Sequence, residues 1–256
     1  MKIFFGLLTS PVEDLGFVSL DVPGWQIESG LGKGRFSSVY SCRRSRTDEV
    51  CVMKVFRAET THLAMTEKSI LTELNGINVE NIPVFRDLYS RSGDLTALVV
   101  TPVGTPVLPC SIPPGMIVAI LHVIRKAHGL GWIHRDIKPD NIYFDSFNPR
   151  RIILNDWSSA VKAGIECDYI GTIIFGDPPN IRGKHVPTSI LDLRSLARTA
   201  FCLSKQHRPL VDDDFDAVAQ YWNEVKRDYS LFAIAMDLAD AGDYDALENF
   251  FRTSWL

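Results

Sequence analysis

The spacing of apolar residues divides the chain into a first part with the pattern of β-strands and a later part with the pattern of α-helices. Up to about residue 103, short apolar and β-branched runs predict four strands, over residues 25–31, 39–43, 50–56 and 95–101. Residues 60–75 have the period of a helix instead, because Leu63, Glu67 and Leu71 recur on one face. This first part therefore predicts a small β-rich unit with one helix.

The second part begins after a stretch rich in glycine and proline, 102–114, which predicts a linker. Beyond it, Ile117, Ile120 and Ile124 form a helical stripe that ends at Gly129. A hairpin is expected over 142–144 and 152–154, and further helices over 189–203, 214–226 and 230–240. The predicted architecture is a small β-rich lobe followed by a larger α-rich lobe, with a ligand cleft where the linker joins them.

Composition narrows the class of protein. Apolar residues make up 46% of the 256 residues and charged residues 23%, which allows a sizeable core and excludes a chain disordered throughout. The five cysteines are widely spaced and form no C-x-x-C pair, which argues against a disulfide framework or zinc site and for a reducing compartment. Because neither a signal peptide nor an apolar run of about 18 residues is found, we expect an intracellular protein, of cytoplasm or nucleus, without a membrane partner.

The charge distribution bears on partners. A net charge of −4 gives no reason to expect nucleic-acid binding. Residues 212–248 nevertheless carry eleven acidic residues against two basic ones. These acids are either solvated helix faces or a surface that attracts a basic peptide over long range. The sequence leaves the oligomeric state open.

A glycine-rich turn joins the first two predicted strands. Gly30, Gly32 and Gly34 have no Cβ atoms, so a phosphate group can approach their backbone N–H groups closely. Taken alone, the same glycines fit a flexible hairpin turn equally well.

Two charged residues fall at apolar positions. Lys54 lies inside the apolar strand 50–56, and Glu67 lies on the apolar face of the helix over 60–75. Since a buried charge is costly without a partner, we expect the two side chains to pair. The alternative for Lys54 is an edge strand from which its ammonium group reaches water.

The most specific pattern precedes the predicted hairpin and reads His-Arg-Asp-Ile-Lys-Pro-Asp-Asn at residues 134–141. Asp156 follows this hairpin, twenty residues after Asp136. Asp136 can accept a hydroxyl proton, and Asn141 and Asp156 supply the oxygen ligands that Mg²⁺ prefers. Any one of these residues fits a surface turn, but chance is a poor explanation for the whole set in this order.

These motifs resemble those of the eukaryotic-type protein kinases over about residues 25–200, and some positions are similar to casein kinase 2. The resemblance implies an α+β, bilobal protein-kinase-like fold, with a small β-rich N-lobe carrying one helix and a larger α-helical C-lobe. We expect an N-terminal extension over 1–24, the N-lobe over 25–103, and a C-lobe over 104–256 that is shortened after residue 200.

The resemblance places ATP beside the glycine-rich turn. Gly32 and Gly34 would cover the phosphates, Lys54 would hold the α- and β-phosphates, and Glu67 would brace Lys54. Val39 would pack on the adenine. The other expected ATP-binding residues belong to the strands and to the hinge between the lobes, residues 101–104. They are Leu31, Val52, Val100, Thr101 and Val103.

The resemblance also implies roles in phosphate transfer. Asp136 would be the catalytic-loop aspartate, Lys138 would neutralise the γ-phosphate, and Asn141 and Asp156 would hold Mg²⁺. Asp192 resembles the buried aspartate of the central large-lobe helix, while its spacing from the preceding serine also fits a capping box.

Departures from the family pattern affect the cleft. Ser37 replaces the third glycine, Val52 replaces the usual alanine, and Trp157-Ser158 replaces Phe-Gly after Asp156. Val52 would narrow the purine slot. Ser158 disfavours a positive φ and therefore predicts a fixed metal-binding loop.

Two further features concern the segment that follows the cleft. Pro179 stands where a glutamate is usual, and 77 residues follow it, so we expect a compact large lobe with altered substrate docking. Arg135 resembles an arginine that pairs with an activation-loop phosphate. Glu166 or Asp168 could supply a permanent anion in its place.

Together these features predict a Ser/Thr protein kinase that transfers the γ-phosphoryl group of ATP, with Mg²⁺, to protein hydroxyls. Lys138 is typical of Ser/Thr specificity, and Asp140 favours a protein substrate that is basic around the acceptor. The alternative is a catalytically weak or inactive pseudokinase that acts as a nucleotide-binding scaffold or regulator. A small-molecule kinase is disfavoured by the Lys-Pro-x-Asn sequence at 138–141.

Overall fold

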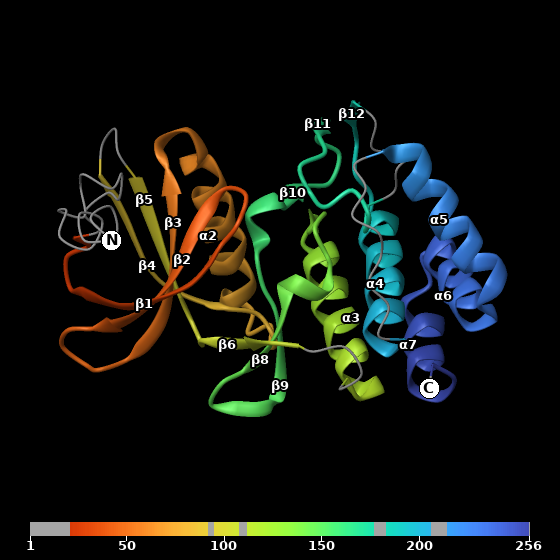
Figure 1. Cartoon of the computed structure of the whole chain (residues 1–256), viewed down its shortest axis with the longest axis horizontal. Coiled ribbons are helices and arrows are strands. Elements are labelled where there is room, and N and C mark those ends of the chain that lie inside the picture. Colours follow the sequence, from red (N-terminus) through yellow and green to blue (C-terminus); the bar gives the residue numbers. More distant parts are fainter. Residues whose placement is uncertain (1–20, 92–94, 108–111, 177–182, 206–213, 256) are drawn as a thin grey trace, which may run out of the picture.

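A β-sheet with one helix lies beside a larger group of helices (Figure 1). This arrangement confirms the bilobal α+β architecture expected from the sequence. The structure is a computed structural model that describes residues 21–91, 95–107, 112–176, 183–205 and 214–255.

The small lobe is a five-stranded antiparallel sheet with the strand order β1-β2-β3-β5-β4. Its strands are β1 (Trp25–Lys33), β2 (Ser37–Arg44), β3 (Val50–Arg57), β4 (Val84–Arg91) and β5 (Leu95–Thr101). The short 3₁₀ helix η2 (Ala58–Thr60) leads from β3 into α2 (Thr61–Gly76), which packs against β3, β4 and β5.

The inner strand β3 is buried on both faces, which explains why its apolar run is nearly continuous. Val52 and Phe56 pack in the cluster that includes α2, whereas Cys51 and Met53 pack in a second cluster on the opposite face. Lys54 shares the face of Val52 and Phe56 and therefore points toward α2. Since β3 pairs with β2 and β5, the edge-strand alternative for Lys54 is wrong.

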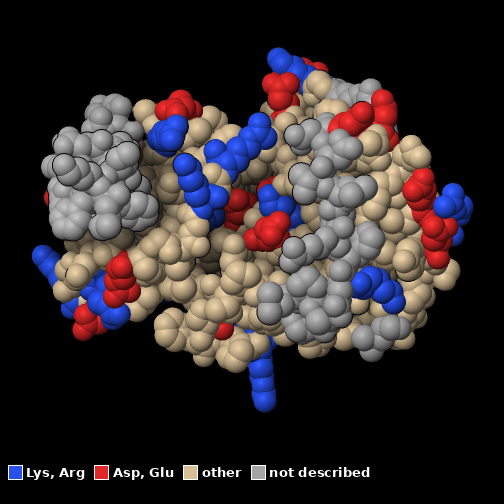
Figure 2. Space-filling view, viewed as in Figure 1, with Lys and Arg blue, Asp and Glu red and all other residues tan. Residues whose placement is uncertain are grey.

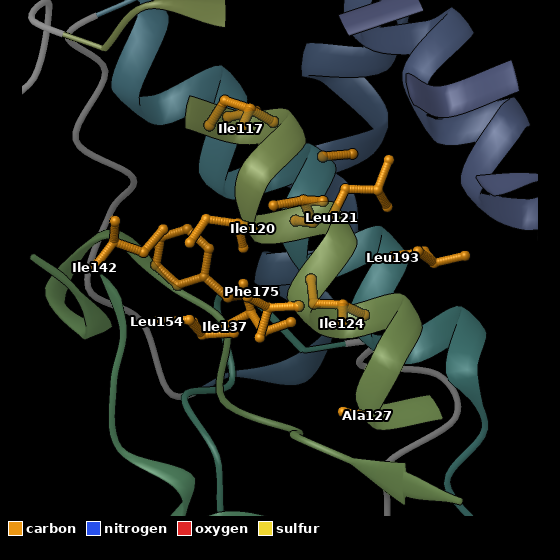
Figure 3. Close-up of a cluster of buried hydrophobic side chains, with 14 of the residues drawn as sticks. Ile117, Ile120, Leu121, Ile124, Ala127, Ile137, Ile142, Leu154, Phe175 and Leu193 are labelled. Atoms are coloured by element: carbon orange, nitrogen blue, oxygen red, sulfur yellow. The ribbon is translucent and has the colours of Figure 1, made fainter. Parts of the chain in front are cut away.

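The large lobe is built mainly from helices. They are α3 (Pro114–Gly129), α4 (Ser189–Ser204), α5 (Phe215–Asp228), α6 (Ser230–Ala241) and α7 (Tyr244–Thr253). Figure 3 shows the apolar stripe of α3, with Ile117, Ile120 and Ile124 among buried side chains from other segments. The same buried cluster includes Leu193 of α4, so the apolar stripe of α3 packs with a helix that is far away in the sequence.

Short strands surround the junction of the lobes. A three-stranded sheet of order β6-β8-β9 contains β6 (Gly104–Pro106), β8 (Ile142–Asp145) and β9 (Asn148–Leu154). Two small antiparallel pairs join β7 (Trp132–Ile133) to β10 (Val161–Lys162) and β11 (Cys167–Asp168) to β12 (Lys184–His185). The 3₁₀ helices η3 (Pro139–Asn141) and η4 (Trp157–Ser159) lie in the loops that carry the candidate site.

The structure adds elements that the apolar pattern did not predict. Strand β4 contains Arg86 and Asp87 and has an irregular register between Phe85 and Asp87, which obscures its period in the sequence. Helix α7 begins after Gly242, and the predicted linker 102–114 contains β6.

Some expectations lie outside the described part of the chain or stay untested. Residues 1–20 of the expected extension, and Pro179, are not among the described residues. The limits at residues 24 and 103 stay predictions. In the described part of the chain, no helix combines the length and apolarity needed to cross a membrane.

Candidate active site

A cleft of about 630 Å³ lies between the two lobes. Figure 2 shows it as a hollow in which acidic and basic side chains gather. Its volume is within the range typical of small-molecule sites. The small lobe contributes the β1–β2 turn and residues of β2, β3 and β5, whereas the large lobe contributes the loops around η3, η4 and residue 172.

Most of the residues expected to bind ATP line this cleft. Those that do so are Leu31, Gly32, Gly34, Val39, Val52, Lys54 and Val100. Thr101 and Val103 are not among the lining residues, although their neighbours Pro102 and Gly104 are. The roles expected of Thr101 and Val103 stay predictions.

The glycine-rich turn forms where β1 passes into β2. The N–H of Gly34 donates to the carbonyl of Ser37 at 2.8 Å and closes the turn. Gly32 is paired with Val39 in the β1–β2 ladder, so the turn lies directly beside the apolar part of the cleft.

Lys54 is almost fully buried and joins the two lobes. Its Nζ donates to Glu67 Oε1 of α2 at 2.6 Å and lies 3.4 Å from Asp156 Oδ1 of the large lobe. Burial alone would lower the pKa of Lys54, but the Asp156 and Glu67 carboxylates outweigh burial and raise that pKa. Lys54 therefore stays charged, as the expected pairing with Glu67 requires.

Both carboxylate oxygens of Asp136 are bonded. Oδ1 accepts the N–H of Thr172 at 2.8 Å, while Oδ2 accepts Asn141 Nδ2 at 3.0 Å and pairs with Lys138 Nζ at 2.9 Å. Lys138 also donates to Thr172 Oγ1 at 2.6 Å. These contacts hold Asp136, Lys138 and Asn141 as one group at the floor of the cleft.

Asp192 of α4 holds the loop that carries Asp136. It accepts the backbone N–H groups of His134 and Arg135 at 2.7 and 2.8 Å and lies 2.9 Å from His128 Nε2. Burial by itself raises the pKa of Asp192, but the bonds from His128 and His134 outweigh it and lower that pKa. A capping role is not seen, since the helix N-cap is Thr188 without a side-chain bond.

Asp156 presents its carboxylate to the cleft from a left-handed backbone, with φ of 59°. Its side chain is 39% exposed, and Ser158 Oγ donates to its Oδ1 at 2.9 Å. Burial raises the pKa of Asp156, but Lys54 and Ser158 outweigh this effect and lower it. Trp157 is fully buried and packs on His134 at a ring distance of 4.4 Å.

Asn141 and Asp156 fit a magnesium site. The Asn141 amide nitrogen donates to the Asp136 carbonyl and carboxylate, which leaves the amide oxygen as a free acceptor among described residues. The described residues contain no group of three or more His, Cys, Asp or Glu suited to a metal. Two oxygen donors are nevertheless enough for Mg²⁺, because it keeps waters and binds substrate phosphates.

In the part of the chain described, Arg135 donates to backbone carbonyls and a thiol, and no bond to a carboxylate is seen. Its Nε donates to the Ser159 carbonyl at 2.6 Å, and its Nη1 lies 2.9 Å from both Cys167 Sγ and the Asp168 carbonyl. The expectation that the Glu166 or Asp168 carboxylate supplies an anion here is therefore wrong, since backbone carbonyls and a thiol occupy those positions.

The sequence did not indicate Tyr143, which lines the cleft from β8. Tyr143 faces Gly104 closely, because a Cβ at Gly104 would lie 2.7 Å from the Tyr143 Cβ. Gly104 in the predicted linker is the sequence feature that this contact requires, but a glycine alone does not indicate which residue approaches it.

Several acids of 214–248 pair with basic side chains on neighbouring helices. Asp237 bonds to Lys226, Asp240 to Arg194 and Asp245 to Arg125, each at 2.6 Å. This pairing favours the interpretation as solvated helix faces over long-range attraction of a basic peptide.

Comparisons with known proteins identify the family. The model of the protein kinase domain matches residues 25–240. Inhibitor of nuclear factor kappa-B kinase subunit alpha of Danio rerio is 24% identical over 65% of this chain and 25% of its own length. Myotonin-protein kinase of Homo sapiens is 28% identical over 63% of this chain and 27% of its length.

Casein kinase II subunit alpha' of Saccharomyces cerevisiae is 24% identical over 54% of this chain and 42% of its own length. The chain thus spans about a quarter of the length of the first two relatives and less than half of the third. The match of the domain model covers both lobes and the cleft between them. The chain therefore belongs to the protein kinase domain family.

Proposed function

We propose that the chain is an active Ser/Thr protein kinase that uses ATP and Mg²⁺. The position of Lys54 carries the proposal, because this buried ammonium group bonds at once to Glu67 of the small lobe and Asp156 of the large lobe. A buried cation held between two carboxylates at the rear of a cleft is suited to bind phosphate oxygens.

The apolar part of the cleft accounts for the base of ATP. Val39, Val52 and Val100 lie on the small-lobe side, and Tyr143 lies on the large-lobe side. These side chains offer two faces to a flat purine, while Lys54 and the glycine-rich turn lie where the phosphates would follow. Bound Mg²⁺ would neutralise phosphate charge, and Asn141 and Asp156 are the residues that would hold it.

Asp136 is the proposed acceptor of the hydroxyl proton. Its Oδ2 is occupied by Asn141 and Lys138, whereas Oδ1 accepts one bond from Thr172 and keeps a lone pair for the substrate. As the hydroxyl oxygen attacks the γ-phosphorus, its proton passes to Asp136 and the bond to the β–γ bridging oxygen breaks, releasing ADP. Lys138 then stabilises charge on the transferred group.

The substrate class is proposed from the rim of the cleft. The Lys138–Thr172 contact supports a Ser or Thr acceptor, in line with the kinases that resemble this chain. Asp140 is exposed and lines the cleft, so a basic residue close to the acceptor would find a carboxylate there.

The test compares the wild type with Lys54→Met and Asp156→Asn in the presence of Mg²⁺ and ATP, alone and with a peptide library. We expect phosphate transfer to Ser and Thr by the wild type only. Lys126→Met and Asp245→Asn change the same residue types at exposed sites of α3 and α7, and should leave transfer intact. Binding of ATP without transfer by any of these proteins would contradict the proposal and favour a nucleotide-binding scaffold.

A further inference from the structure

Three consecutive backbone carbonyls, those of residues 174–176, are held by buried side chains of the large lobe. Trp222 Nε1 of α5 donates to the Ile174 carbonyl at 2.5 Å. Ser195 Oγ of α4 lies 2.8 Å from the Phe175 carbonyl and 2.9 Å from the Leu191 carbonyl. Arg198 of α4 donates from Nη1 to the carbonyls of residues 175 and 176. We call Ser195, Arg198 and Trp222 the carbonyl-binding cluster.

The members of the cluster are buried, and two of them, Arg198 and Trp222, pack on each other. Ser195, Arg198 and Trp222 are 1%, 5% and 4% exposed. The Arg198 guanidinium lies over the Trp222 ring at 5.5 Å, and the ring of Phe232 stacks on Trp222 at 5.4 Å. A buried guanidinium is costly unless its N–H groups find acceptors, and the carbonyls of residues 175 and 176 provide acceptors for Arg198 Nη1.

The segment that the cluster holds is a compact turn over 172–176. The N–H groups of Phe175 and Gly176 donate to the Thr172 carbonyl at 3.0 and 3.1 Å, and Gly176 also donates to Ile173 at 3.0 Å. Phe175 belongs to the buried cluster of Figure 3, so its ring is fixed by the core while its carbonyl is fixed by α4. A displacement at one end of this turn is therefore passed to the other end.

The other end of the turn touches the proposed catalytic residues. The Thr172 N–H donates to Asp136 Oδ1, and Thr172 Oγ1 accepts from Lys138. The preceding Gly171 is pressed against the catalytic loop, since a Cβ there would lie 2.2 Å from the Arg135 carbonyl oxygen. The chain passes between these groups with little space for adjustment.

We propose that Ser195, Arg198 and Trp222 are positioning residues for phosphate transfer, which act through the turn 172–176 to hold Thr172 against Asp136 and Lys138. This inference rests on the proposed kinase function. None of the three side chains lines the cleft. Their loss should therefore affect the transfer step and leave nucleotide binding unchanged.

The main test uses Trp222→Phe, which keeps an aromatic ring and removes the N–H donor, and Arg198→Lys, which keeps the charge and removes the fork of donors. We expect kcat to fall about fivefold to tenfold in each variant, while the KM for ATP changes less than about twofold. Hydrogen exchange of the Thr172 amide, measured without substrate, should become faster in both.

Two matched variants serve as controls. Trp25→Phe also removes an indole donor, whose bond goes to Asp87 in the small lobe, and Ser204→Ala removes a hydroxyl from the end of α4. Both should retain the wild-type kcat and Thr172 exchange. Should Arg198→Lys fail to fold, Trp222→Phe carries the test by itself.

The outcomes separate this inference from the proposed function. An unchanged kcat in folded variants, or a rise in the KM for ATP equal to the fall in kcat, would overturn the positioning role. If the wild type transfers no phosphate, the proposed function is wrong. Faster Thr172 exchange in Trp222→Phe would then still support the coupling of the cluster to Thr172, and unchanged exchange would refute it.

Discussion

The indole Nε1 of Trp132 donates a hydrogen bond of 2.7 Å to Glu73 Oε2 and so joins α2 of the small lobe to β7 of the large lobe. Lys162 Nζ of β10 lies 3.2 Å from both oxygens of the same carboxylate and 4.2 Å from the Trp132 ring centroid. The bond from Trp132, with Lys162, lowers the pKa of Glu73. Helix α2 is thus attached to the large lobe at Glu73 as well as through Glu67 and Lys54.

Removing this attachment should weaken the Lys54–Glu67 pair. In Glu73→Ala we expect a fall in kcat of about threefold to tenfold, because α2 becomes freer to move away from β3. Since the Glu73 side chain is 40% exposed, solvent screens the pair and the loss of stability should be only about 1 kcal/mol. Peptide phosphorylation and urea unfolding measure the two effects. Glu80→Ala, at an exposed site beyond α2, is the control, and equal behaviour of both variants would refute the coupling.

Activity should not depend on phosphorylation of the loop near Arg135. The Arg135 guanidinium is already bonded to the Ser159 and Asp168 carbonyls and to Cys167, so no phosphate is needed to hold it. We expect phosphatase-treated protein, checked by mass spectrometry, to keep the kcat of the untreated protein. A loss of activity on treatment that returns on rephosphorylation would show that this interpretation of Arg135 is wrong.

Ser158 should keep Asp156 in a single orientation. Its hydroxyl bonds to Asp156 Oδ1, and its backbone lies in η4 without a positive φ. Ser158→Gly removes the bond and frees the backbone, whereas Ser158→Ala removes the bond alone. We expect Mg²⁺-dependent nucleotide binding to weaken about fivefold in Ser158→Ala and further in Ser158→Gly. Wild-type structures with and without nucleotide that differ in the Asp156 orientation would contradict this prediction.

His134 should make the fold less stable in mild acid. It is 1% exposed, and burial lowers its pKa below the usual 6.5 despite the nearby acids Asp192, Asp136 and Asp156. Below about pH 6.5 the unfolded chain therefore binds a proton at His134 that the folded chain resists. The contribution of neutral His134 to the free energy of unfolding is complete above that pH and is lost as the pH falls.

The measurement is the free energy of unfolding in urea at several values between about pH 5 and 7.5, for the wild type and His134→Phe. The free energy of unfolding should rise with pH more steeply in the wild type than in His134→Phe. The difference between the two slopes is at most about 1.4 kcal/mol per pH unit, because one proton is involved. His62→Gln replaces an exposed histidine and should keep the wild-type slope. Parallel curves for wild type and His134→Phe would exclude His134 as the cause.

Much of the fold was predictable because the relevant information is local. The apolar run of β3 is typical of a strand buried on both faces, and the helical period of α2 arises from residues that share one face. The pairing of Lys54 with Glu67 could be predicted as well, since two charges at apolar positions need each other. By contrast, β4 and α7 were missed, because one has polar residues and an irregular register and the other is a short helix of ten residues.

The sequence by itself determined which chemical groups are present and in which order, and thereby the family and the set of proposed catalytic residues. Only the tertiary structure decided which groups meet: Glu73 with Trp132, Tyr143 with Gly104, and Arg198 with the turn 172–176. The physical reason is that these contacts join segments distant in sequence, and a buried donor takes whichever acceptor the packed chain brings within reach.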